Sequence, residues 1–581
     1  MGNHGTSLRY ERAIKVAAVP LSLIMCLLFM TPCPSGAEPE TWDPARNYLQ
    51  ERAGEFIRVM VSSENAMSLG GTTLLVPDML ERFYRRRHYQ PAWFGHDGSF
   101  PHTETMLDAI REVEKEGLSP DFYHHQSITM LRDELARELN MNPETMAELD
   151  VLLTDAYLML GCHFSAGCID PLTTESGWYV NRDDLDVSLY LEDALRENNI
   201  RESLVNLLPM QPSYYGLRQK LMELREITVR GGWPELWASR LLRRGADDPL
   251  IGDIRERLAV SGDLDDSGSE KRNLFDAGLE KAVRKFQKRH GLSPDGIVGR
   301  ETLAAMNVTA DRRMRQIEVN LERMRWTSRN LGHRYIIVNI ADFTLDIIEH
   351  GASVMKMDVV VGKPFWHTPV FSGKMRYIIV NPSWNVPESI ALEEVIPKVK
   401  HDPGYLEAQQ IKIFKSWSDS AEEIDPETID WTRIGDNHFP YAFRQMPGPL
   451  NPLGNIKFML PNKYNVYLHD TPAKGLFSRN SRAFSHGCIR VRYPMSLAEY
   501  LLRDSQEWSR AKIQAAVDEG REQRINLPAP IDVHIVYLTA WVDNEGVLNF
   551  RNDVYGRDEL LLKALKRSPL LVVTKEEGAP L

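Results

Sequence analysis

One short stretch of the chain brings a cysteine and two histidines close together. Residues 485–490 read Ser-His-Gly-Cys-Ile-Arg, and a further histidine, His469, precedes them on an apolar segment. A cysteine is a weak nucleophile as a thiol and a strong one as a thiolate, so a nearby imidazole that takes its proton enables acyl transfer. Cys488 is therefore a candidate nucleophile, with His469 and His486 as candidate bases.

Each neighbour of the cysteine suggests a role. His486 is two residues from Cys488, so both face the same side in an extended segment, whereas His469 approaches from across the fold. Gly487 permits a tight turn in which the amides of Gly487 and Cys488 point at a developing oxyanion. Arg490 lies on the same side as Cys488 and is suited to hold a substrate carboxylate.

Other interpretations of these residues stay open. Sulfur and imidazole also bind zinc, although a structural zinc site needs four ligands and Cys488, His469 and His486 have no partner motif. Cys488 can also be a packing residue and Arg490 a surface ion-pair residue. Asp470 is expected in a turn rather than as a triad acid. Three tryptophans are expected mainly in cores: Trp384, Trp417 and Trp431.

The composition sets the class of protein. At 581 residues the chain predicts two to four domains, and its net charge of −12 without a long basic run makes nucleic acid an unexpected partner. No motif calls for a cofactor or a metal.

The N-terminus has the pattern of an export signal. Basic residues precede an apolar run over 16–30, and small residues at 35 and 37 suit cleavage after Ala37. We expect residues 1–37 to be a signal peptide, with an uncleaved inner-membrane anchor as the alternative, and the protein to be periplasmic. Cys162 and Cys168 can then form a disulfide or stay unpaired.

The periodicity changes along the chain. Residues 38–265 are mostly helical, with a buried helix over 149–160, and 261–269 has the composition of a linker. From residue 335 short β-branched segments predict strands, which resume after 450. The intervening residues 382–450 are interpreted as a lid inserted into a mainly β domain. Late strands over 533–547 are expected to complete the same sheet.

The segment between these regions resembles a known module. The pattern FQ…GL…DG.VG..T…L runs from Phe286 to Leu303 and resembles the small helical peptidoglycan-binding module. The resemblance predicts such a module over 270–308, which either binds murein or only spaces the domains.

The catalytic stretch resembles a family as well. Tyr467-Leu-His469-Asp-Thr-Pro, followed by Ser485-His-Gly-Cys488-Ile-Arg490, resembles the catalytic motif of the YkuD-type L,D-transpeptidases. The order of parts is similar to the large murein L,D-transpeptidases of Gram-negative bacteria. The resemblance implies a multidomain α+β protein: helical scaffold (38–265), peptidoglycan-binding module (270–308), mainly β catalytic domain (330–558) and C-terminal tail (559–581).

The resemblance also implies the reaction. Cys488 would be the nucleophile and His469 the base, with His486 and Gly487 shaping the oxyanion site. Tyr467, Ser485 and Arg490 would contact substrate. The substrates would be two peptidoglycan stem peptides joined by a 3→3 cross-link through a thioester, with other cell-wall enzymes as further partners. Water (an L,D-carboxypeptidase), a lipoprotein lysine as acceptor, and a non-catalytic murein-binding scaffold are the alternatives.

Overall fold

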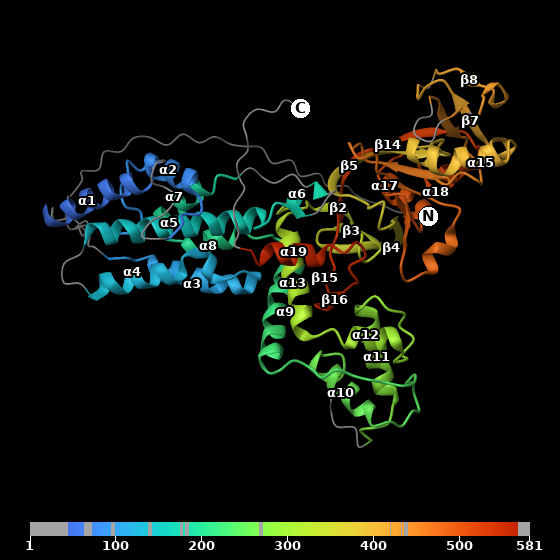
Figure 1. Cartoon of the computed structure of the whole chain (residues 1–581). Helices are drawn as coiled ribbons and strands as arrows, with labels where there is room; N and C mark the ends of the chain where they lie inside the picture. Colours follow the sequence, from blue (N-terminus) through green and yellow to red (C-terminus); the bar gives the residue numbers. More distant parts are fainter. Residues whose placement is uncertain are drawn as a thin grey trace, which may run out of the picture.

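The computed structural model describes residues 44–62, 72–94, 99–137, 142–174, 178–179, 185–265, 271–418, 420–431, 433–434 and 440–567. The chain has a mixed helical and sheet architecture: an elongated helical body, a small helical module, a β-rich domain and an insert projecting from it (Figure 1). The predicted signal segment 1–37 lies outside the described residues. None of the described helices combines the length and apolar character needed to cross a membrane.

The N-terminal body is built around helix α5 (Pro143–Ala166). Asn142 caps it by accepting a hydrogen bond from the Glu144 N–H (3.0 Å), and the helix is buried on nearly all sides. The predicted buried helix over 149–160 is confirmed, and Cys162 and Cys168 are unpaired thiols. The surrounding helices are α1 (Pro44–Met60), α2 (Pro77–Arg86), α3 (Thr103–Glu112), α4 (His125–Arg137), α7 (Val187–Glu197), α8 (Ile200–Val205) and α9 (Pro212–Val229).

The small module has its own core and begins earlier than predicted. Helix α10 (Leu250–Val260) packs with α11 (Ala277–Arg289) and α12 (Arg300–Met306). Ile254 and Leu258 of α10 belong to this core rather than to the scaffold, because they close the apolar face of α11. The boundary expected at 265–270 therefore falls inside the module.

Helix α13 (Ala310–Arg325) connects the module to the β-rich domain and runs beside α9 (Figure 1). Its buried Glu322 accepts hydrogen bonds from Arg325 (2.7 Å) and from the backbone N–H of Ile169 (2.8 Å). Charged groups this deeply buried are stable only when paired. The pairing fixes the scaffold against the rest of the chain.

The β-rich domain is one sheet that closes on itself. The order is β1-β5-β10-β11-β13-β4-β3-β2-β14, where β1 is Trp178–Tyr179, and β14 pairs with both β2 and β5. The strands enclose an apolar core, and α17 (Pro494–Leu502) and α18 (Arg510–Asp518) contribute to it. The strands are β2 (Arg334–Asn339), β3 (Thr344–Glu349), β4 (Ala352–Gly362), β5 (Val370–Val380), β10 (Ile456–Met459), β11 (Leu468–His469), β13 (Ile489–Val491) and β14 (Gln523–Val536).

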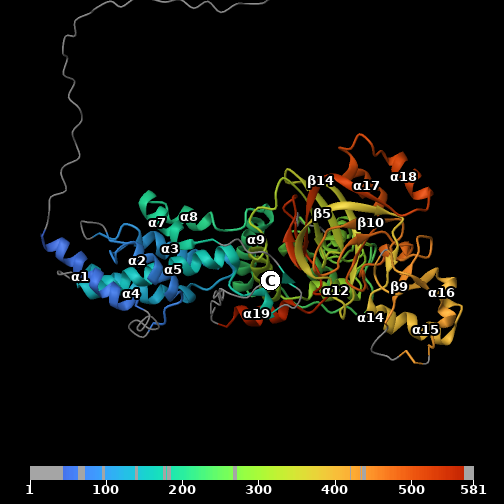
Figure 2. The ribbon, with the colours of Figure 1, turned by 90° about the horizontal axis from the view of Figure 1, so that it is seen from above.

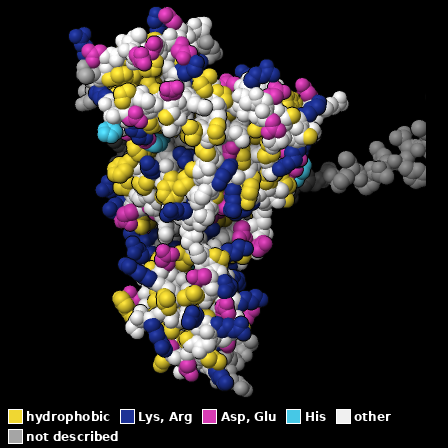
Figure 3. Space-filling model, turned by 90° about the vertical axis from the view of Figure 1, so that its right-hand side faces the viewer, with side chains coloured by type: hydrophobic (Ala, Val, Ile, Leu, Met, Phe, Trp, Pro, Cys, Tyr) yellow, Lys and Arg dark blue, Asp and Glu magenta, His cyan; other side chains and the backbone are white. Residues whose placement is uncertain are grey.

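The insert is a small body with a separate core. It contains α15 (Ile396–His401), α16 (Tyr405–Ala408) and a four-stranded sheet ordered β6-β9-β7-β8. Its strands are β6 (Trp384–Asn385), β7 (Ile411–Phe414), β8 (Glu423–Ile424) and β9 (Ala442–Gln445). Figure 2 shows it at the end of the molecule remote from the scaffold, and Figure 3 shows it above the sheet domain with the module at the opposite end. Trp431 stacks near Phe443 in its core, whereas Trp417 is half exposed.

Two expectations about the C-terminal region are wrong. The late hairpin, β15 (Ala540–Val542) and β16 (Leu548–Phe550), forms its own two-stranded sheet instead of extending the main one. Val542 packs against Gly216 of α9, where an added Cβ would lie 2.8 Å from it, so its apolar face belongs to the scaffold core. The expected tail from 559 instead starts as α19 (Asp558–Leu565), which buries Leu561.

Candidate active site

Cys488 sits at the end of a tight turn between β12 (Ala483–Ser485) and β13. The Ser485 hydroxyl accepts from the Gly487 N–H (3.1 Å) and donates to the Cys488 carbonyl (2.5 Å). Gly487 has a φ of +110°, a conformation that residues with a Cβ rarely adopt. Thr368 donates to the Gly487 carbonyl (2.8 Å) and so ties the turn to the preceding loop. The cysteine is therefore presented by a fixed backbone.

Three basic side chains align across neighbouring strands beside the turn. Lys457 of β10 pairs in register with His469 of β11, and His469 pairs with Arg490 of β13. Residues paired in this way project from the same face of a sheet. The strand pairing places His469 in the middle of this row, next to the strand that follows Cys488.

The orientation of His469 is set by backbone. Its Nδ1 lies 2.5 Å from the Asp470 carbonyl, which can only accept a hydrogen bond, so Nδ1 carries the proton and Nε2 has a free lone pair. Burial and, to a smaller extent, the nearby charge of Arg490 lower the pKa of His469 to about 3. The imidazole is therefore neutral at neutral pH and able to accept a proton.

Asp470 holds the turn rather than the imidazole. Its carboxylate accepts from the backbone N–H of Asn455 (2.9 Å) and of Thr471 (2.7 Å), and pairs with Lys474. This agrees with the expectation of a turn residue and not a triad acid.

The thiol is also neutral at rest. Partial burial raises the pKa of Cys488, and this is opposed by hydrogen bonds from Tyr467 and by the charges of Lys457 and Arg490. Tyr467 lies with its ring 3.9 Å from the Lys457 ammonium and 5.7 Å from the His469 ring. The cations that surround the sulfur would stabilise a thiolate once the proton has left.

His486 turns away from the sheet toward the insert. Its Nε2 lies 3.0 Å from a carboxylate oxygen of Glu394, and its ring lies 4.4 Å from that of Trp366. Glu394 belongs to a π-helical turn, Ala391–Val395, a distortion often found at functional sites. Burial lowers the pKa of His486, and Glu394 opposes the shift. The insert therefore contacts the catalytic stretch directly.

The structure brings together most of the predicted residues but changes two roles. Tyr467 and Arg490 lie beside Cys488, and His469 pairs with Arg490 on the neighbouring strand. The Gly487 N–H is not available to an oxyanion, because it donates to Ser485. The Ser485 side chain is buried and its hydroxyl is used within the turn, so it positions Cys488 instead of contacting substrate.

Sequence reasoning missed three neighbours of the site: Lys457, Thr368 and Glu394. Lys457 had a signal, since it lies two residues before the end of a predicted strand that precedes His469. Thr368 and Glu394 are far from the motif in sequence and only the fold brings them near. Within the described residues, no group of three or more His, Cys, Asp or Glu side chains is arranged to hold a metal ion.

Family models match three parts of the chain. Residues 333–513 match the L,D-transpeptidase catalytic domain, residues 247–306 the "Putative peptidoglycan binding domain" and residues 78–221 the scaffold domain. Residues 333–513 are thus similar to the catalytic domain of the YkuD-type L,D-transpeptidases. The module match also starts before residue 270, as the packing of α10 does.

One curated relative and two solved structures are similar to parts of the chain. A "Putative L,D-transpeptidase" of Haemophilus influenzae is 36% identical over 226 residues, 39% of this chain and 45% of the relative, so the chain spans about half of that relative's length. An L,D-transpeptidase from Stackebrandtia nassauensis is 13% identical, covering 51% of this chain and 94% of that one, with a TM-score of 0.20. One from Mycobacterium smegmatis is 12% identical, covering 35% and 58%, with a TM-score of 0.16.

Proposed function

We propose that the protein is an L,D-transpeptidase that forms 3→3 peptidoglycan cross-links through a thioester on Cys488. The observation that carries the proposal is the Cys488–His469 arrangement: a neutral imidazole fixed through Nδ1, one strand from the thiol. The match of residues 333–513 to the L,D-transpeptidase catalytic domain supports the substrate class.

The first half of the reaction would acylate the enzyme. The Cys488 proton passes to His469 Nε2 as the sulfur attacks the carbonyl carbon of the third residue of a stem tetrapeptide. The bond to the terminal D-alanine nitrogen breaks, and His469 returns the proton to that nitrogen. The Cys488 N–H, which donates no hydrogen bond within the described chain, is the backbone donor best placed for the oxyanion.

The second half would transfer the acyl group. The side-chain amine of the diamino acid of a second stem attacks the thioester, the carbon–sulfur bond breaks, and the amine proton returns to sulfur through His469. Lys457 and Arg490 would stabilise the departing thiolate, and Arg490 would also attract a stem carboxylate.

The insert would act as a lid over this chemistry. Glu394 of the insert contacts His486, so residues 382–450 would be close enough to contact the donor stem as it binds. The module over 247–306 would hold the enzyme on murein, which requires an exported, periplasmic protein with residues 1–37 as signal or anchor.

Mass spectrometry of muropeptides tests the proposal. Purified protein incubated with a disaccharide tetrapeptide should yield a dimer with a 3→3 bond and free D-alanine. Tripeptide alone would favour the carboxypeptidase, and product only in the presence of a lipoprotein C-terminal lysine would favour the attachment enzyme. Absence of any product from folded, reduced protein that still binds sacculi would favour the scaffold.

A further inference from the structure

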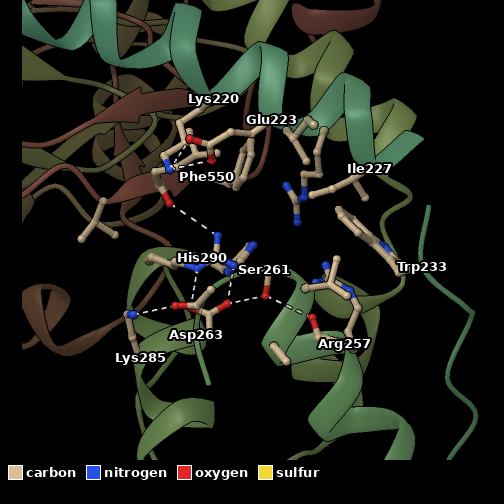
Figure 4. A pocket seen from close by; sticks show the side chains of 18 of the residues that line it. Lys220, Glu223, Ile227, Trp233, Arg257, Ser261, Asp263, Lys285, His290 and Phe550 are labelled. Atoms are coloured by element: carbon tan, nitrogen blue, oxygen red, sulfur yellow. Dashed lines mark hydrogen bonds and ion pairs between the residues drawn. The ribbon is translucent and has the colours of Figure 1, made fainter. Parts of the chain in front are cut away.

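A cavity lies away from Cys488, where scaffold, module and C-terminal hairpin meet (Figure 4). Its volume is about 320 Å³, within the range of small-ligand pockets. Figure 4 shows Lys220, Glu223 and Ile227 of α9 facing side chains of the module below, including Arg257, with Trp233 at one side. The hairpin contributes Leu548 and Phe550.

The cavity has an excess of buried positive charge. Three arginines line it from α10, α11 and α13, and each is at least nine-tenths buried: Arg257, Arg289 and Arg313. Asp263 is the buried carboxylate among the described lining residues, and Arg289 takes both of its oxygens (2.7 and 2.5 Å). The other acid, Glu223, pairs with Lys220 (2.7 Å). Arg257 and Arg313 therefore form no ion pair with a described lining residue, although the charge of Asp263 also acts on Arg257.

Those two groups also have unused donors. The Arg257 Nε donates to the Met306 carbonyl (3.1 Å) and the guanidinium lies 3.7 Å from the Trp233 ring, but its buried Nη1 has no partner in the described chain. Arg313 donates through Nη1 to Gln316 (2.9 Å), and its buried Nε is likewise unpartnered there. A buried donor on a charged group is costly to leave unsatisfied.

The electrostatics agree with this geometry. Burial, together with the charge of Arg289, lowers the pKa of both Arg257 and Arg313 to about 9. Three like charges in one buried cavity repel one another, and an anion among them would remove that cost. In Figure 4 the Arg257 side chain rises from α10 into the space below α9, where such an anion would sit.

We propose that this cavity binds the free carboxylate end of a short peptide, with Arg257 and Arg313 as its anion partners; the identification of that peptide as a peptidoglycan stem rests on the proposed function. Guanidinium groups bind carboxylate and phosphate alike. The Asp263 carboxylate remains in the cavity and would repel a dianionic phosphate more than a singly charged carboxylate. The apolar surfaces of Trp233, Leu548 and Phe550 suit alanine methyl groups.

The site is composite. The module supplies Arg257, whereas Arg313 comes from α13 and two apolar walls come from α9 and the hairpin. A ligand bound there would therefore contact all three parts at once and hold the module against the scaffold.

Binding is tested by calorimetry on the full chain carrying Cys488→Ala, which prevents turnover. The probes are a stem tetrapeptide with a free C-terminal carboxylate, the same peptide as its C-terminal amide, and inorganic phosphate. In that background we expect Arg313→Gln to weaken binding of the acid peptide at least tenfold. Arg312→Gln, the matched control at the exposed neighbouring position, should bind like the parent.

A second variant guards against misfolding. Val547→Asp adds a carboxylate at the partly exposed hairpin edge of the cavity while leaving the buried arginines intact, and it should also weaken binding of the acid peptide. The proposal is overturned if the amide binds in the same Arg313-dependent way as the acid. It is equally overturned if phosphate binds more tightly, or if Arg313→Gln and Val547→Asp both bind like the parent.

The two proposals fail separately. Arg313 lies in another part of the chain from Cys488, so Arg313→Gln in the otherwise unchanged protein should cross-link soluble tetrapeptide at the normal rate. Cross-linking by the unsubstituted protein without Arg313-dependent binding overturns the cavity alone. Arg313-dependent binding of the acid peptide without any cross-linking overturns the proposed reaction and leaves the cavity standing.

Discussion

The Cys488 site and the arginine cavity differ in the charge that their side chains carry at rest. The Cys488 thiol has a raised pKa and the His469 imidazole a lowered one, so both members of the proposed reacting pair are neutral at rest. In the cavity, Arg257 and Arg313 remain cations without a carboxylate of their own. At the Cys488 site, charge would form during the proposed reaction. In the cavity, the arginines would bind a negative charge carried by a ligand.

The two sites also differ in how the chain builds them. The proposed base, His469, lies on the strand beside the one that follows Cys488, and a backbone carbonyl next in sequence orients its ring. The cavity takes side chains from residues 220 to 550, none of which forms a spaced motif. Chemistry contained in a short stretch is readable as a pattern, whereas a composite site appears only with the fold.

The largest expected effect comes from removing the nucleophile. Cys488→Ala should abolish acyl-enzyme formation, because no other described thiol has the histidine and cations of this site. Intact-protein mass spectrometry after treatment with a carbapenem should show one adduct on the parent and none on the variant. An adduct that maps to Cys162 or Cys168 would contradict the assignment; burial raises the pKa of both thiols and makes them poor nucleophiles.

Removing the base should have the next largest effect. His469→Ala should slow acylation by roughly 10²–10⁴-fold, the usual contribution of a positioned general base. His486→Ala is the comparison, since that imidazole faces Glu394. The measurement is the single-turnover acylation rate of each variant. A greater loss of rate in His486→Ala than in His469→Ala would reverse the two roles.

The neutral pair predicts an unusual pH dependence. Folded His469 takes up a proton only near pH 3, whereas the unfolded chain does so near 6.5, so the unfolded state binds more protons in between. Stability should therefore fall as the pH drops below 6.5, by up to about 1.4 kcal/mol per unit from this residue. Urea unfolding of the parent and of His469→Gln at pH 7, 5.5 and 4.5 measures the contribution of His469 to this loss of stability. Equal losses of stability in the two proteins would contradict the prediction.

Features that have a local sequence pattern could be predicted from the sequence, whereas contacts between distant parts of the chain could not. The buried helix α5, the strand β10 and the cysteine motif each have a local pattern, and each is where the pattern indicates. The hairpin over 540–550 has an equally clear strand pattern, but Gly216 of a distant helix decides what it packs against. Gly487 was assigned its conformation correctly, yet its N–H is used by the Ser485 hydroxyl, which no spacing rule indicates.

A smaller effect should follow from loosening the turn. Ser485→Ala removes both hydroxyl hydrogen bonds from a buried position, which should cost about 1–3 kcal/mol of stability. Acylation should slow by roughly tenfold, since about 1.4 kcal/mol of lost positioning corresponds to one order of magnitude. Ser478→Ala is the matched control, because its exposed hydroxyl only donates to the Gly475 carbonyl. Thermal unfolding and acylation rates that are alike in the two variants would mean that the turn holds without Ser485.

The smallest expected effect concerns the contact between the insert and the Cys488 site. It shows whether residues outside the short catalytic stretch contribute to that site. Glu394 and His486 are both partly exposed, so their contact should be worth less than about 1 kcal/mol. Glu394→Gln should lower the pKa of His486, because the carboxylate opposes the effect of burial, and should increase hydrogen exchange over Ala391–Val395. Glu393→Gln, the exposed neighbour, should change neither quantity. An NMR titration of His486 measures its pKa, and hydrogen–deuterium exchange measures the change over Ala391–Val395.

If Glu394→Gln changes both quantities while acylation of a soluble peptide keeps its rate, the insert contacts the site without contributing to acylation. If acylation falls severalfold, the Cys488 site is composite too, and the contrast with the arginine cavity is one of degree.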